Sequence, residues 1–218
     1  MQKRMALQRQ SKEVRYKIKS PSVVILAGPT QSGKTTLISR LIRHSSYWSE
    51  VVPKEIIYCY SVWQEKFNAL QDIVTFNKGL ISLEDDIPND GEHRWLILDD
   101  LMEEVTKSST QKTFTFYSHH KNVTVFFLIQ NFFEKNIRTI TLNAHYIAFF
   151  KNPRDRSQIL TLGQKVFPNQ KERVCSAYRD AAKAAYSHLW FDLTQDADDD
   201  LRLLGNYGSD PKLPIVVY

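Results

Sequence analysis

The chain has 218 residues, 42% hydrophobic and 24% charged, a length and balance that fit one globular α/β domain. Its two cysteines, Cys59 and Cys175, are far apart and form no C-x-x-C pair, so they imply neither a disulfide framework nor a zinc site. No apolar run approaches the roughly 20 residues of a membrane helix, and the charged N-terminus lacks the apolar core of a signal peptide. We therefore expect a soluble protein that has no membrane span and is not secreted.

The net charge of +5 is concentrated at the N-terminus. Residues 1–20 carry seven basic side chains against one acidic side chain, and the rest of the chain is close to neutral. A basic arm of this kind contacts phosphates or an acidic partner, or remains a solvated tail. Charge alone leaves these alternatives open.

The first predicted elements enclose a phosphate-binding motif. Residues 23–27 are apolar and β-branched, as in a buried strand, and residues 36–43 repeat apolar side chains at helical spacing. Between them GPTQSGKT, residues 28–35, matches G-x-x-x-x-G-K-[ST] at every fixed position. Glycines in such a loop let backbone N–H groups surround a phosphate at a helix N-terminus. Lys34 is expected to reach the β- and γ-phosphates and Thr35 to bind Mg²⁺. The residues expected to bind ATP are Gly28, Pro29, Thr30, Gln31, Ser32, Gly33, Lys34, Thr35 and Thr36.

Apolar strands and helical segments alternate through the rest of the chain. Strands are predicted over residues 55–61, 94–100, 123–129, 146–150 and 188–192, with a brief edge strand at 73–76. Helices are predicted over 63–71, 108–120, 154–166 and 171–185, and residues 136–144 are ambiguous between helix and loop. Asn152 suits the N-cap and Pro153 the first position of the helix at 154–166. The alternation predicts an α/β fold with an open, mostly parallel sheet flanked by helices.

Two acidic residues end the predicted strand over residues 94–100. A metal-bound nucleotide needs a carboxylate opposite the phosphate loop, and Asp99 meets this need in the manner of a Walker B acid that holds Mg²⁺ directly or through water. Asp100 is placed to orient or deprotonate the attacking water. Aspartate is one methylene shorter than the glutamate common there, so Glu103 or Glu104 is the alternative base. A solvent-facing turn is the other interpretation of two acids at a strand end.

Gln130 ends the next strand, where an amide hydrogen-bonds the attacking water or senses the γ-phosphate. Asn131 is the adjacent alternative, and a turn residue is the simpler interpretation. This strand follows the acidic one, as in P-loop ATPases of the additional-strand, RecA-like type, whose extra strand lies between phosphate loop and Walker B strand.

Arg138, Arg154 and Arg156 are candidates for an arginine supplied to a neighbouring subunit's nucleotide, although each also fits a surface or salt-bridging role.

Three segments together resemble a known family: VILAGPTQSGKT at 24–35, WLILDDLM at 95–102 and FFKNPRD at 149–155. They are similar to the genome-packaging ATPases of the FtsK–HerA superfamily, most closely the poxvirus-type branch of Polinton (Maverick) elements and adintoviruses. Residues 178–193 resemble the C-terminal part of that branch, and the likeness covers roughly residues 15–205. Gln31 departs from the pattern where many relatives carry glycine, and Asp100 where glutamate is common.

The resemblance implies an ATP-driven motor that threads viral double-stranded DNA into a preformed capsid. It also implies a homo-oligomeric ring of five or six subunits, nucleotide sites between neighbours, capsid vertex proteins as partners, and a location in the virion or at the assembly site inside the host cell. The alternatives are a small P-loop kinase and an ATP-binding DNA or capsid switch with little turnover. The expected division is a basic arm over 1–20, a P-loop ATPase domain over 21–193 and an acidic tail or edge segment over 194–218.

Overall fold

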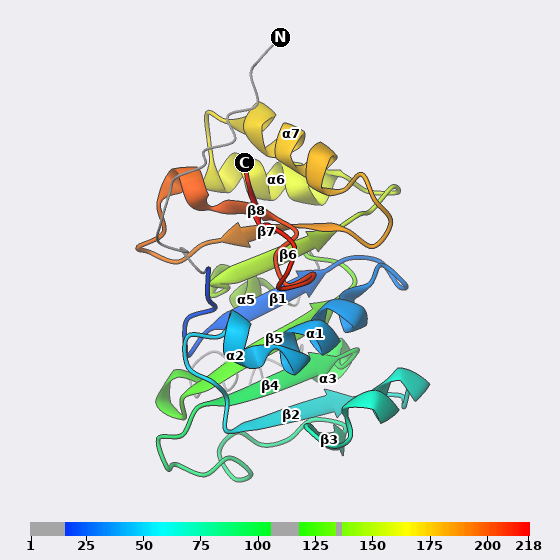
Figure 1. Ribbon diagram of the computed structural model, residues 1–218, viewed down its shortest axis with the longest axis vertical. Helices are drawn as coiled ribbons and strands as arrows, with labels where there is room; N and C mark the ends of the chain where they lie inside the picture. The colour runs from blue at the N-terminus through cyan, green and yellow to red at the C-terminus, as the bar shows by residue number, and fades with distance from the viewer. Residues whose placement is uncertain (1–15, 106–117, 134–136) are drawn as a thin grey trace.

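In the computed structural model, which describes residues 16–105, 118–133 and 137–218, nine strands form one sheet. Their order is β3-β2-β4-β5-β1-β6-β7-β8-β9, and the sheet runs along the longest axis of the molecule (Figure 1). The six strands from β3 to β6 are parallel, whereas β7, β8 and β9 are antiparallel to their neighbours. The strands are β1 (Val23–Ala27), β2 (Glu55–Tyr60), β3 (Thr75–Lys78), β4 (Arg94–Asp99), β5 (Val123–Ile129), β6 (Tyr146–Phe150), β7 (His188–Asp192), β8 (Leu203–Gly205) and β9 (Val216–Val217).

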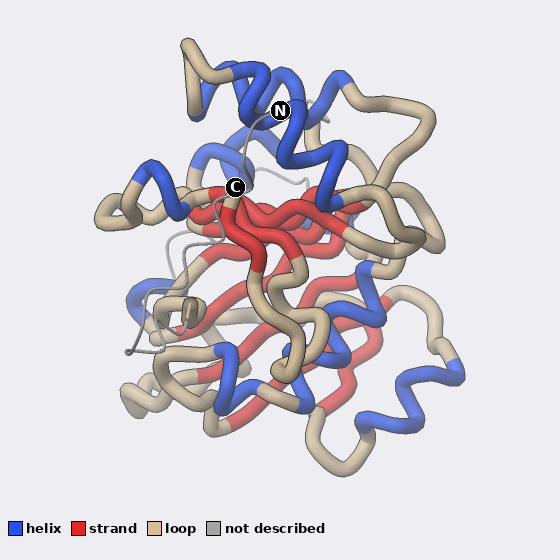
Figure 2. Tube along the Cα trace, turned by 45° about the horizontal axis from the view of Figure 1, so that its top comes forward, coloured by secondary structure: helices blue, strands red, loops and turns tan. Residues whose placement is uncertain are grey.

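Helices cover both faces of this sheet (Figures 1 and 2). One face packs against α1 (Lys34–Arg43), α2 (Ser45–Trp48) and the 3₁₀ helix η1 (Glu65–Leu70). The other packs against α3 (Met102–Val105), α5 (Arg138–Leu142), α6 (Ser157–Val166) and α7 (Lys171–Ala181). A second 3₁₀ helix, η3 (Asp199–Leu201), precedes β8. The fold is therefore an α/β sandwich of three layers, as the alternating sequence pattern predicts.

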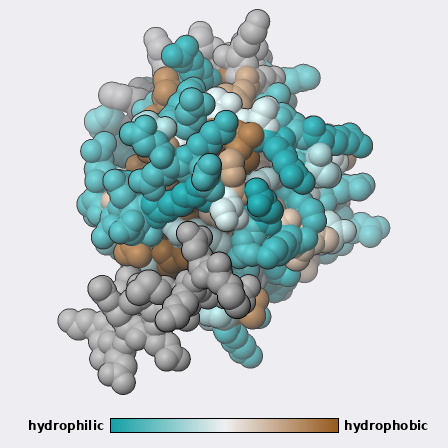
Figure 3. Space-filling view, turned by 90° about the horizontal axis from the view of Figure 1, so that it is seen from above, coloured by the Kyte–Doolittle hydropathy of each residue, from teal (hydrophilic) through white to brown (hydrophobic). Residues whose placement is uncertain are grey.

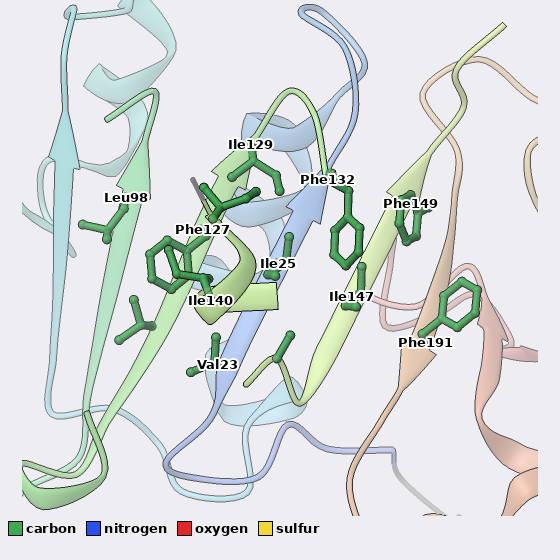
Figure 4. Close-up of a cluster of buried hydrophobic side chains, with 14 of the residues drawn as sticks. Val23, Ile25, Leu98, Phe127, Ile129, Phe132, Ile140, Ile147, Phe149 and Phe191 are labelled. Carbon is green, nitrogen blue, oxygen red and sulfur yellow. The ribbon is translucent and has the colours of Figure 1, made fainter. Parts of the chain in front are cut away.

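Strand β1 lies in the middle of the sheet, and its side chains pack into the hydrophobic cores on both faces. Val23 and Ile25 belong to the core beneath α5 (Figure 4), and Val24 and Leu26 to the core beneath α1. All four are fully buried, and each contributes about 1.5–3 kcal/mol through burial of its apolar surface. A strand buried on both faces is typical of the centre of a parallel sheet, which fixes the position of the loop that follows it.

The order of the central strands confirms the additional-strand arrangement. β5 lies between β1, which precedes the phosphate-binding motif, and β4, which ends in Asp99. The carboxyl ends of these strands meet at one edge of the sheet, where ligands of open α/β folds bind.

Several predicted boundaries differ from the structure. The helix expected from Arg154 begins at Ser157, because Asn152 Oδ1 accepts the N–H groups of Arg154 and Asp155 and so closes a turn before the helix. Asn152 is therefore not the N-cap of α6, nor is Pro153 its first residue. The helix expected over 171–185 ends at Ala181.

Other elements are shorter, shifted or better defined than predicted. The helix expected over 63–71 is the 3₁₀ helix at 65–70, the edge strand expected at 73–76 lies at 75–78, and the ambiguous segment 136–144 contains α5. Of the helix expected over 108–120, residues 118–120 are helical and the rest lies outside the described residues. The sheet does not end at β7 but continues through β8 and β9.

The face seen from above, over α6 and α7, shows mostly hydrophilic side chains with small apolar patches between them (Figure 3). Among the helices of the described residues, none combines the length and the apolar character needed to cross a membrane.

Candidate nucleotide-binding site

The phosphate-binding motif forms the loop between β1 and α1, at the carboxyl edge of the parallel strands (Figure 1). Gly33 immediately precedes α1 with a φ of 106°, and α1 begins at Lys34 without a side-chain cap from any described residue. The first N–H groups of a helix have no partner within the helix. The start of α1 therefore offers free backbone donors and a partial positive charge to an anion.

Two positions show how closely the loop is packed. A Cβ atom on Gly28 would lie 2.6 Å from Phe150 Cβ and 2.8 Å from Ser32 Oγ, so only glycine fits there. Gln31 adopts a φ of 62°, the left-handed region that glycine enters at little cost. The loop thus keeps a glycine-like conformation at the position where the sequence carries glutamine instead of the glycine of many relatives.

A cavity of about 390 Å³ opens on this loop and brings most of the predicted site together. Its walls include the motif residues 30–36 together with Asp99, Asp100 and Gln130. Gly28 and Pro29 do not line it, but their carbonyl oxygens accept hydrogen bonds from Lys34. The sequence did not indicate the other polar or aromatic residues of the wall, which are Arg40, Gln64, Lys66, Tyr186, His188 and Ser209.

Lys34 is held inside the loop by backbone carbonyls. Its Nζ donates to the carbonyl oxygens of Gly28 at 2.6 Å and Pro29 at 2.9 Å. Burial lowers the pKa of the ammonium, and the carboxylates of Asp99 and Asp100 oppose this shift. A half-buried cation held by neutral carbonyls is well placed to exchange them for anionic oxygens.

Asp99 is buried at the end of β4 and accepts two hydrogen bonds on one oxygen. Tyr58 Oη donates to Asp99 Oδ2 at 2.7 Å, and Thr35 Oγ1 donates to the same atom at 3.4 Å. Burial raises the pKa of Asp99, while the Tyr58 hydrogen bond and the positive charges of Lys66 and Lys34 lower it. Both hydrogen bonds end on Oδ2, and Oδ1 of Asp99 accepts no hydrogen bond from any described side chain.

The sequence did not indicate Tyr58. It lies in the middle of β2, fully buried, and reads as an ordinary core aromatic. Tyr58 pairs with Ile97 of β4, so Asp99 is its diagonal neighbour two residues further on the same face. Only the pairing of β2 with β4 reveals this contact, and strand pairing is not visible in one sequence.

Asp100 and Gln130 meet at the mouth of the cavity. Gln130 Nε2 donates to Asp100 Oδ1 at 3.4 Å, which joins the ends of the neighbouring strands β4 and β5. Both side chains are exposed, and Asp100 has a φ of 57°, a conformation that short polar residues tolerate better than others. The pair is positioned to contact a water molecule beside the phosphate loop.

The alternative residues occupy other places. Asn131 Oδ1 accepts the N–H of Phe133 and so closes the turn after β5. Glu103 and Glu104 lie in the first turn of α3 and do not line the cavity. The geometry therefore favours Gln130 over Asn131 and Asp100 over the two glutamates.

The three candidate arginines lie outside the cavity. Arg138 is exposed at the start of α5, and Arg154 and Arg156 are exposed in the turn before α6. Arg156 lines a second cavity of about 270 Å³ between this turn and α7. Within one chain, none of them is brought to the nucleotide site, and a role in a neighbouring subunit's site stays a prediction.

The donor set for a metal is small. The described residues contain no group of three or more His, Cys, Asp or Glu side chains that could hold a metal ion. The Thr35 hydroxyl and the Asp99 carboxylate, 3.4 Å apart, are the oxygen donors beside Lys34. Mg²⁺ in phosphate-binding sites usually has one or two protein oxygens and takes its other ligands from phosphate and water, and this pair fits that pattern.

The chain matches no protein-family model and no curated protein. Among solved structures it is similar to the genome packaging NTPase B204 from Sulfolobus turreted icosahedral virus 2. The complex with sulfate has 14% sequence identity and a TM-score of 0.54, and the complex with AMPPCP has 16% identity and a TM-score of 0.54. Both matches cover 81% of this chain and 94% of the other. At such identities the likeness shows the fold, an α/β P-loop NTPase fold.

Proposed function

We propose that this protein is a viral genome-packaging ATPase that couples ATP hydrolysis to the movement of double-stranded DNA into a capsid. The observation that carries the proposal is the cavity in which Lys34, Thr35, Asp99, Asp100 and Gln130 converge. The strand order β4-β5-β1 that places them is that of additional-strand ATPases. The structural neighbour adds support, since it is a genome packaging NTPase seen in complex with AMPPCP.

Each residue has a role that its contacts support. Lys34 would exchange the carbonyls of Gly28 and Pro29 for oxygens of the β- and γ-phosphates. Thr35 and Asp99 would hold Mg²⁺, which neutralises charge on the phosphate oxygens when it is bound. Tyr58 keeps the Asp99 carboxylate in place.

Asp100 would accept the proton of the attacking water, and Gln130 would orient both that water and Asp100. The two side chains are in contact already, so little rearrangement is needed once the phosphates are bound. This assignment makes Asp100, and not Glu103 or Glu104, the base.

The assembly is the finer part of the proposal. We infer a ring of five or six copies in which Arg138, Arg154 or Arg156 reaches a neighbour's nucleotide, because all three are exposed and outside the chain's own cavity. Of the predicted basic arm, Ile18 is buried and Lys19 pairs with Asp196, so the DNA contact is proposed for residues 1–15, which lie outside the described residues. They would contact the DNA backbone independently of base sequence. Capsid vertex proteins would be the further partners, at the site of virus assembly or in the virion. Membership of the poxvirus-type branch of the FtsK–HerA superfamily rests on the sequence resemblance.

The site assignment is tested with Lys34→Ala and Asp100→Asn, and with Lys78→Ala as an exposed lysine control on β3. Lys34→Ala should abolish hydrolysis and weaken ATP binding, whereas Asp100→Asn should bind ATP normally and lose hydrolysis. Lys78→Ala should behave as wild type in both assays. Normal turnover in Lys34→Ala would refute the site, and turnover in Asp100→Asn would transfer the base to Glu103 or Glu104.

The ring is tested by mixing subunits. Arginine variants should turn over slowly by themselves, and addition of Lys34→Ala subunits, which still carry the arginine, should restore part of the activity. Absence of any rescue with Arg138→Ala, Arg154→Ala and Arg156→Ala would argue against an arginine supplied by a neighbour.

A further inference from the structure

Tyr186 is the one aromatic residue of the Phe, Tyr or Trp type in the described wall of the nucleotide cavity. It lies in the loop between α7 and β7, and 70% of its surface is exposed. Its phenol group makes no hydrogen bond or ring contact with any described residue. A large aromatic side chain left open to solvent beside a cavity provides a flat apolar surface for a ligand.

The backbone of Tyr186 is strained. Its φ is 61°, a left-handed conformation that is a true outlier for a bulky residue. Two hydrogen bonds hold the segment: Ser187 Oγ donates to the Ala184 carbonyl at 2.7 Å, and Lys151 N donates to the Ser187 carbonyl at 2.9 Å. Strain of this kind persists where the surroundings impose it and is concentrated at functional sites.

The loop also packs directly on the phosphate-binding motif. A Cβ atom on Gly33 would lie 3.1 Å from Tyr186 Cβ and 3.5 Å from the Tyr186 carbonyl oxygen. Gly33 therefore leaves room for Tyr186, and the strained conformation seats the tyrosine against the loop that would hold the phosphates.

The sheet order sets the direction in which a nucleotide would lie. The strands lie in the order β4-β5-β1-β6-β7 across the sheet. Asp100 and Gln130 follow strands on one side of β1, and Tyr186 precedes β7 on the other side. A triphosphate with its γ-phosphate toward Asp100 and Gln130 would extend its nucleoside toward Tyr186. The cavity continues there to Arg40 of α1 and to Ser209.

We propose that the ring of Tyr186 stacks on the base of the bound nucleoside triphosphate; this inference rests on the nucleotide site proposed above. Every base presents a π-face to such a platform, so the contact strengthens binding without selecting one base. Tyr186 thus determines affinity for the nucleoside part, while residues 28–36 determine affinity for the phosphates.

The test compares three ligands on the full chain, each with Mg²⁺: ATP, GTP and inorganic tripolyphosphate, which has no base. Tyr186→Asn removes the ring but accepts the left-handed conformation, so the loop stays folded. Tyr186→Phe keeps the ring and removes only the hydroxyl. Dissociation constants are measured by calorimetry, and hydrolysis gives kcat and KM.

The expected result separates base from phosphate. Tyr186→Asn should raise the Kd for ATP and GTP by about 5- to 150-fold, the range of one lost base–aromatic stack, and leave the Kd for tripolyphosphate within about twofold of wild type. KM for ATP should rise with little change in kcat, because the ring is remote from the reacting atoms. Tyr186→Phe should resemble wild type.

Three results would overturn the inference. Unchanged ATP affinity in Tyr186→Asn would show that the ring does not touch the base. An equal loss for ATP and tripolyphosphate would show that Tyr186 acts through the phosphate loop. Failure of the wild type to bind any of the three ligands would refute the nucleotide site itself, and this separates failure of the proposed function from failure of the Tyr186 contact.

Discussion

Replacement of Tyr58 by phenylalanine tests the buried network around Asp99. The change removes one hydroxyl, which donates to Asp99 Oδ2 at 2.7 Å, and leaves that oxygen with only the longer 3.4 Å contact from Thr35. Tyr58 is fully buried and Asp99 is 7% exposed, so water does not readily replace the lost donor. A hydrogen bond to a charged group contributes roughly 1.5–3 kcal/mol. The free energy of unfolding of Tyr58→Phe at pH 7 should therefore be about 2 kcal/mol below that of the wild type.

The sign of the Asp99 shift allows a sharper version of this test. Burial holds the pKa of Asp99 above its usual range, so the ionised carboxylate costs stability at neutral pH and Tyr58 offsets part of that cost. In an Asp99→Asn background the acceptor is neutral and the same hydrogen bond contributes only about 1 kcal/mol. Urea denaturation of the wild type, both single variants and the double variant should show this difference.

The control is Tyr146→Phe. Its hydroxyl accepts the backbone N–H of Lys19 at 3.2 Å, and its loss should cost the same in both backgrounds, since independent sites add. An equal cost of Tyr58→Phe in the wild-type and in the Asp99→Asn background would instead show that Tyr58 stabilises the fold by packing and not through the carboxylate.

Three further predictions concern the loop and its surroundings. Gly28→Ala should lower the free energy of unfolding by about 1–3 kcal/mol and abolish ATP binding, since its Cβ would clash with Phe150; normal binding in calorimetry would contradict this. Gln31→Gly removes a side chain from a backbone position in the left-handed region. The free energy of unfolding should rise by about 0.5 kcal/mol after the larger chain entropy of glycine is subtracted, and a decrease above about 1 kcal/mol in urea denaturation would contradict this. Burial lowers the pKa of His188 to about 4, so the unfolded chain takes up a proton first as the pH falls below about 6.5. The free energy of unfolding should then decrease by about 3 kcal/mol between pH 7 and pH 4, and His188→Gln should lack this share; an unchanged pH profile in that variant would refute it.

Most of the candidate site could be predicted from the sequence because its signals are local. The phosphate-binding motif fixes a loop, and the apolar stretches ending in Asp99 and Gln130 read as buried strands whose polar ends face the same edge. The order β4-β5-β1 followed from the order of these strands along the chain together with the arrangement known for additional-strand ATPases.

The residues that were missed depend on contacts between distant segments. Tyr58 reaches Asp99 only because β2 pairs with β4, and Tyr186 lines the cavity only because the loop before β7 packs on Gly33. In the sequence, one reads as a core aromatic and the other as a loop residue. Both require the tertiary structure.

The wrong boundaries have two different causes, one local and one tertiary. At Asn152, the side chain satisfies two backbone N–H groups of a turn instead of those of a helix, and both uses share the same sequence signature. β8 and β9 are three and two residues long, too short for a period-two pattern, and their strand character comes from pairing with β7 and with each other.

If this cavity powers a DNA motor, long double-stranded DNA must accelerate ATP hydrolysis. Steady-state hydrolysis is therefore measured with and without such DNA. The assay is run at low and at moderate salt, with Lys34→Ala as the background control. DNA should strongly stimulate hydrolysis, and the stimulation should fade as the salt concentration rises, because contacts to the phosphate backbone release counterions. Hydrolysis that depends on Lys34 but is indifferent to DNA at every salt concentration would rule out a DNA motor and favour a P-loop kinase.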